Sequence, residues 1–142
     1  MQRVFCQELL DVRGGIEHVL GVWHDIDRPL CIDDVLQYNG SIPDTMPPFD
    51  PNSDVDYGEQ ARLMHVQRIR YCMLNPSAWP PLEIESDMAW GTVMLNDGHH
   101  RLAAAHLLEL ETVPVVWSGI WKDIRASLPR SYRAGLLRLA FD

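Results

Sequence analysis

The strongest structural signal in this chain is Leu95-Asn96-Asp97-Gly98-His99-His100-Arg101-Leu102-Ala103-Ala104-Ala105. An apolar segment over 93–95 stops at the Asn-Asp-Gly sequence, where glycine permits the backbone angles of a tight turn. Residues 102–110, rich in alanine and leucine, follow at once and predict a helix. The stretch therefore predicts a strand, a turn and a helix in immediate succession.

A basic cluster falls in the first turn of this predicted helix. His99, His100 and Arg101 lie where the backbone N–H groups point away from the helix and where positive side chains are unfavourable. An anion, most simply a phosphate, would neutralise both the side chains and the helix dipole. We therefore expect an anion site here, with Arg101 as its main ligand, because the sequence offers no structural reason for an arginine in that turn.

Composition indicates one ordinary globular domain. The chain has 142 residues, of which 46% are hydrophobic and 23% charged. No apolar stretch approaches the ~20 residues of a membrane span, and the N-terminus lacks the apolar core of a signal peptide. We expect no membrane partner and a cytoplasmic location. The three cysteines, Cys6, Cys31 and Cys72, are widely spaced, which predicts reduced thiols rather than disulfides or a metal knuckle.

The net charge of −8 is unevenly distributed. Residues 1–60 hold 3 basic and 12 acidic residues, whereas residues 61–142 hold 9 basic and 8 acidic ones. An acidic surface repels nucleic acid, so a nucleic-acid partner is disfavoured, although the basic residues of the last 21 positions could form a local basic face.

Periodicity divides the chain into two parts. Residues 1–58 are expected to form an N-terminal extension and an acidic, proline-rich loop, both packed on a core formed by residues 59–142. Residues 59–74 predict a helix with Leu63, Val66, Ile69 and Met73 on its apolar stripe.

Strands are predicted over 82–85, 91–95 and 112–117, with Pro114 indicating an edge strand or the start of a strand, and a helical tail follows. This order predicts a small α/β (α+β) fold with a short mixed sheet flanked by helices. Ligands in such folds lie at strand-to-helix turns.

Residues 59–117 resemble the ParB/sulfiredoxin superfamily. The resemblance is carried by 81–85, by 94–105 with its G-x-x-R motif, and by the Val-Pro-Val-Val sequence at 113–116. It implies a nucleotide-phosphate site in which Gly98 lets the backbone approach the phosphates and Arg101 holds them through two hydrogen bonds. His99 or His100 would then serve as a donor or a proton shuttle.

Departures from the family pattern narrow the expected activity. Sulfiredoxins have a nucleophilic cysteine where this chain has His99, so sulfinic-acid reduction is not expected. Centromere-binding members carry Gly-Glu-Arg-Arg and a helix-turn-helix domain, for which the 25 residues after Trp117 are too few. The Asp-Gly-His-His-Arg form is closest to the free-serine kinase branch and to small stand-alone members.

We therefore expect a nucleotide-binding protein that takes ATP, ADP or CTP with Mg²⁺ and hydrolyses the nucleotide or transfers phosphate to a small acceptor. The phosphate ligands would be Asp97, Gly98, His99, His100 and Arg101, and the catalytic candidates are His99, His100 and Glu83. The alternatives are a DNA-binding or nuclease member of the superfamily, and a non-catalytic module that binds a protein partner.

Several candidate residues have two interpretations. Asp97 would be the helix N-cap or a carboxylate facing a metal, and capping is favoured because it needs no further assumption. His99 and His100 project about 100° apart on a helix, so one of them is expected to face the ligand. His65 and Arg68, one turn apart, would reach the same anion or form an exposed polar face.

Residues outside the turn are also open to two interpretations. Glu83 and Glu85 share one strand face, where Glu83 would act as a base or hold Mg²⁺ through water, or both would face solvent. Trp79 and Trp90 would stack on a base or lie in the core. A metal site built from the histidines at 65, 99, 100 and 106 matches no known ligand spacing, so no metal site is expected.

Overall fold

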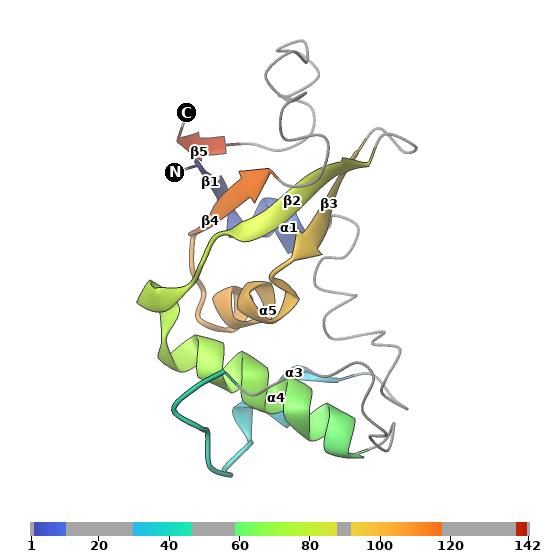
Figure 1. Cartoon of the computed structure of the whole chain (residues 1–142), viewed down its shortest axis with the longest axis vertical. Coiled ribbons are helices and arrows are strands. Elements are labelled where there is room, and N and C mark those ends of the chain that lie inside the picture. The colour runs from blue at the N-terminus through green and yellow to red at the C-terminus, as the bar shows by residue number, and fades with distance from the viewer. Residues whose placement is uncertain (1, 11–29, 47–58, 88–91, 118–138, 142) are drawn as a thin grey trace.

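A five-stranded mixed sheet and a short stack of helices form the described part of the chain (Figure 1). The computed structural model describes residues 2–10, 30–46, 59–87, 92–117 and 139–141. The strands are β1 (Gln2–Phe5), β2 (Leu82–Asp87), β3 (Thr92–Asp97), β4 (Thr112–Trp117) and β5 (Leu139–Phe141), in the order β3-β2-β4-β1-β5. The helices are α1 (Cys6–Leu10), α3 (Ile32–Leu36), α4 (Glu59–Leu74), the 3-10 turn η1 (Pro76–Ala78) and α5 (His99–Leu107). The α/β class expected from the sequence is confirmed.

The sheet combines a hairpin with a crossover. β2 and β3 pair antiparallel, with Ile84 opposite Leu95, and the register shifts between Glu83 and Ile84. The chain then passes through α5 and returns as β4, which pairs parallel to β2, while β4 pairs antiparallel to β1. The end of β3 and the start of α5 therefore meet at one edge of the sheet.

Pro114 lies inside the sheet, so the expectation of an edge strand is wrong. β4 is flanked by β2 and β1, and Pro114 stands opposite Arg3 of β1. Proline removes a single ladder donor. The neighbouring side chains of Val113, Val115 and Trp117 are buried in the core, and their burial outweighs that loss.

Helix α5 lies between the sheet and α4, as Figure 1 shows, and it contributes to both hydrophobic cores. Leu102 and Ala105 pack with the sheet residues Leu82 and Ile84, and Ala103 and Ala104 pack with α4. Alanine has a small side chain, so α4 approaches α5 closely. The layers are therefore sheet, α5 and α4.

The inward face of α4 differs from the predicted apolar stripe. Val66 and Ile69 are buried as expected and Met73 is partly buried, but Leu63 is 45% exposed. His65, by contrast, is fully buried. The predicted apolar stripe was wrong at Leu63 because α5 packs on the face of α4 that carries His65.

Segments near the N-terminus form part of the same sheet and helix layers. β1 pairs with β4 near the middle of the sheet, and α3 packs on α4 through Val35 and an Arg62–Asp34 ion pair of 2.8 Å. Trp90, residues 47–58 of the loop expected over 39–58, and most of the helical tail expected over 120–142 lie outside the described residues. The described end of that tail, Leu139–Phe141, is strand β5, so the helical expectation is wrong there because these residues pair with β1. Among the described helices, none has the length and apolar character needed to cross a bilayer.

Candidate functional site

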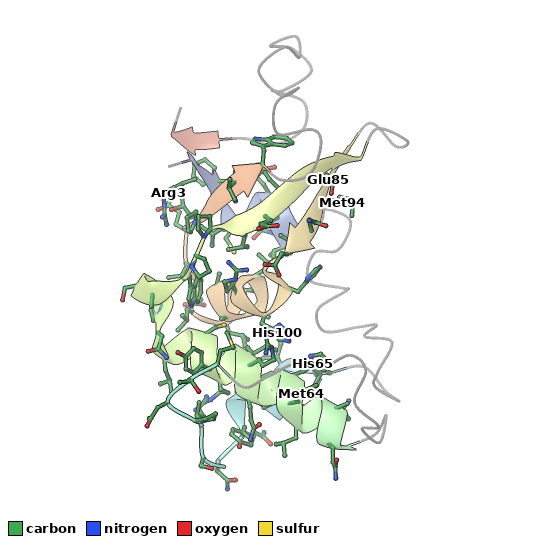
Figure 2. All side chains as sticks on the ribbon, in the orientation of Figure 1. Arg3, Met64, His65, Glu85, Met94 and His100 are labelled. Carbon is green, nitrogen blue, oxygen red and sulfur yellow. The ribbon has the colours of Figure 1, made fainter. Side chains whose placement is uncertain are left out.

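A pocket of about 390 Å³ opens between α4, the segment after it and the first turn of α5. The end of β3, the turn after it and the first turn of α5 contribute Asp97, Gly98, His99, His100 and Arg101, and α4 contributes His65 and Arg68. Figure 2 shows His65 on α4 and His100 on α5 facing each other between the two helices. The predicted turn residues and both predicted helix residues are thus brought together in one place.

Gly98 creates the turn at the base of this pocket. Its φ of 107° is a conformation that side chains with a Cβ rarely adopt, and an added Cβ would lie 2.8 Å from Cγ of Leu82. The first bond of α5 runs from the Leu102 amide to the Gly98 carbonyl at 2.8 Å. The basic cluster therefore occupies the first turn of α5, as expected, and glycine is required by both backbone angle and packing.

Arg101 has a structural role that the sequence did not reveal. Its guanidinium donates to the carbonyl oxygens of Pro80 at 2.6 Å and Pro81 at 2.8 Å, and to Oδ2 of Asp97 at 2.9 Å. Its side chain is only 11% exposed. The view that an arginine has no structural reason to occupy this turn is wrong, because the segment before β2 passes beside it.

Asp97 does not cap α5, so the favoured interpretation of this residue is wrong. Gly98 is the N-cap, and no side chain hydrogen-bonds the helix end. Asp97 is the last residue of β3, its carboxylate accepts from Arg101, and its side chain is 64% exposed. The strand continues through this residue, and its carboxylate therefore remains accessible beside the pocket.

His65 and His100 form a close pair across the two helices. Nδ1 of His65 lies 2.9 Å from Nε2 of His100, and the ring planes are inclined by only 16°. His65 is 0% exposed, so the alternative of an exposed polar helix face does not hold for it. Burial, followed by the interaction with His65 and the positive charge of Arg68, holds the pKa of His100 well below its usual value. His100 is therefore neutral at pH 7.

Arg68 is the second guanidinium of the site. It lines the pocket, and burial lowers its pKa while the interactions with Cys72 and Asp97 act in the opposite direction. An arginine remains protonated under such a shift. A positive charge in a partly desolvated wall attracts an anion more strongly than the same charge in water.

Cys72 of α4 and Asn75, the residue after α4, extend the pocket lining that begins at His65 and Arg68. They were not among the expected site residues, although the spacing 65, 68, 72, 75 follows one side of a helix. Burial raises the pKa of Cys72 to about 11, against the charges of Arg101 and Arg68. The thiol is therefore protonated and unreactive at neutral pH.

The remaining candidates separate into those at the pocket and those away from it. His99 and His100 both line the pocket, so the expectation that only one faces the site is not met. Glu83 is not among the lining residues; Leu82 and Ile84 are buried in the core, which turns Glu83 and Glu85 to the other face of β2.

His106 and Trp79 have separate environments. His106 borders a different pocket beside α1 and the end of α5. Trp79 packs against both cores and borders the main pocket, and its indole N–H donates to the Cys72 carbonyl at 2.9 Å. Within the described ranges, three or more His, Cys, Asp or Glu side chains nowhere cluster as a metal site would require.

Comparisons with protein-family models, with curated proteins and with solved structures give no match to this chain.

Proposed function

We propose that the pocket binds the phosphates of a nucleoside di- or triphosphate and supports hydrolysis of the nucleotide or phosphate transfer to a small acceptor. One observation carries this proposal: Arg68 of α4 and the first turn of α5 converge on a single pocket. A guanidinium and the positive end of a helix dipole act on the same space, and both favour an anion. The resemblance of residues 59–117 to the ParB/sulfiredoxin superfamily supports the choice of a nucleotide.

The size and polarity of the pocket agree with such a ligand. Its volume of about 390 Å³ lies within the roughly 300–1,000 Å³ typical of small-molecule sites. Asp97 is the only carboxylate among the described residues that line it, and its exposure makes it the natural contact for a Mg²⁺ ion that arrives with the nucleotide. Trp79 adds an apolar side chain to the lining of the pocket.

The two arginines have different tasks in this proposal. Arg101 already donates to two carbonyls and to Asp97, so it mainly holds the turn in shape. Arg68 contributes the positive charge that contacts phosphate. This assignment reverses the ranking expected from the sequence, in which Arg101 was the principal ligand.

Thermal shift and calorimetry with ATP, ADP and CTP, each with and without Mg²⁺, test the proposal. A nucleotide at about 100 times its Kd should stabilise the protein by about 2.7 kcal/mol. Arg68→Gln should weaken binding at least about tenfold, which corresponds to about 1.4 kcal/mol.

Arg70→Gln is the matched control, because it removes the same charge from the same helix at a position that does not line the pocket. The nucleotide affinity of Arg70→Gln should stay within about twofold of that of the unmodified protein. Absence of stabilisation by every nucleotide would contradict the proposal, and equal losses in the two variants would place the phosphate site elsewhere.

A further inference from the structure

The buried imidazole of His65 is the least expected polar group in the described part of the molecule. It is 0% exposed and lies in the layer between α4 and α5, among residues such as Val66 and Ile69. Burying a polar ring is costly unless its nitrogens are hydrogen-bonded. Nδ1 meets Nε2 of His100 at 2.9 Å, so this contact links the interior to the pocket.

We infer that His65 is a positioning residue, which accepts the Nε2–H of His100 and so makes His100 the general base of the site. This inference rests on the proposed function. A separation of 2.9 Å requires one hydrogen between the two nitrogens, because two N–H groups or two lone pairs would repel. When His65 accepts, His100 carries its lone pair on Nδ1, and the imidazolium formed on protonation keeps its hydrogen bond to His65. A histidine base is held in the same way by its acceptor in Ser-His-Asp sites.

The charges around His100 favour its neutral form. Positive charge faces it from α4 at Arg68 and from α5 at Arg101, while Cys72 carries a protonated thiol. A bound phosphate supplies the compensating negative charge, which raises the proton affinity of the ring when substrate is present. The titratable groups of α4, α5 and β3 that line the pocket with His100 are His65, Arg68, Tyr71, Cys72, His99, Arg101 and Asp97.

The step balances without any redox partner. The oxygen of water or of a small hydroxyl acceptor forms a bond to the terminal phosphorus as the bond from that phosphorus to the bridging oxygen breaks. The shortened nucleotide leaves with the bonding electron pair, and the hydroxyl proton passes to Nδ1 of His100 and then to solvent. Nothing else is consumed.

Nitrogen NMR of protein labelled with ¹⁵N-histidine tests the positioning role without any ligand. The expected spectrum shows His100 as the Nε2–H tautomer. His65→Phe keeps a ring of similar volume and removes the acceptor, so His100 should become a mixture of tautomers. His65→Asn places an amide oxygen near the position of Nδ1 and should restore the Nε2–H form. A single Nδ1–H tautomer in the unmodified protein, or no change in His65→Phe, would overturn the inference.

Kinetics in the same variants test the base role. His65→Phe should lower kcat by about 10–100-fold with little change in KM and should shift the pH profile, while His65→Asn recovers part of the rate. His106→Phe, on α5 with His100 but at the other pocket, is the control and should retain the original rate. Nucleotide binding without turnover would overturn the base role alone, whereas absence of nucleotide binding would overturn the proposed function.

Discussion

Asp97 and Arg101 join the last residue of β3 to the first turn of α5 through an ion pair of 2.9 Å. The same guanidinium holds the Pro80 and Pro81 carbonyls. One side chain therefore connects the end of a strand, the start of a helix and the segment that enters β2. These contacts shape the wall of the pocket that we assign to phosphate.

Arg101→Ala should lower the free energy of unfolding by roughly 1.5–3 kcal/mol, because it removes charge-assisted hydrogen bonds from a largely buried group. Arg101→Lys should recover only part of this loss, since an ammonium group cannot reproduce the planar geometry of three simultaneous contacts. Urea unfolding measures both variants. An unaltered midpoint in Arg101→Ala would contradict the structural role.

Gly98→Ala should destabilise the protein by roughly 1–3 kcal/mol. Alanine would have to adopt the φ of 107° that Gly98 has. Its Cβ would lie 2.8 Å from Cγ of the fully buried Leu82. Relief of this contact would displace the start of α5, so nucleotide affinity should also fall. Thermal unfolding and the nucleotide titration check the two effects, and a variant with unchanged melting temperature would show that the turn tolerates a side chain.

Stability should depend on pH through His100. Its pKa is lower in the folded protein than the value of about 6.5 expected for an unfolded chain. The unfolded chain therefore binds a proton first as pH falls. The contribution is fully present above about pH 6.5 and is progressively lost below it, until the folded pKa is reached.

Urea unfolding between pH 8 and pH 5 measures this dependence. His100→Asn removes the titrating ring, so the decline below pH 6.5 should be shallower in that variant than in the unmodified protein. Equal slopes in the two proteins would assign the acid sensitivity to other groups.

The three cysteines should differ sharply in reactivity. Cys31 is exposed, whereas Cys6 and Cys72 are buried and burial raises the pKa of each, that of Cys72 to about 11. Iodoacetamide at pH 8 should therefore modify Cys31 quickly and the other two only after unfolding. Peptide mapping by mass spectrometry reads the order directly, and equal labelling of Cys72 and Cys31 in the native protein would contradict the described packing.

Much of the fold was predictable because it depends on short-range pattern. The helix expected over 59–74 is α4, and the strands expected over 82–85 and 91–95 are β2 and β3. Pro114 and Leu63 were misjudged because their positions depend on which elements pack against them. Strand order and the choice of helix face are set by contacts between distant segments.

The sequence by itself determined the strand, the glycine turn and the basic first turn of α5, since neighbouring residues specify these features through backbone preference and helix geometry. Only the tertiary structure decided what the basic residues do. Arg101 is engaged by carbonyls about 20 residues earlier in the chain, and His100 meets His65 across 35 positions. Ala103 and Ala104 allow α4 to pack closely on α5, and this packing brings Arg68 and the buried histidine to the same pocket.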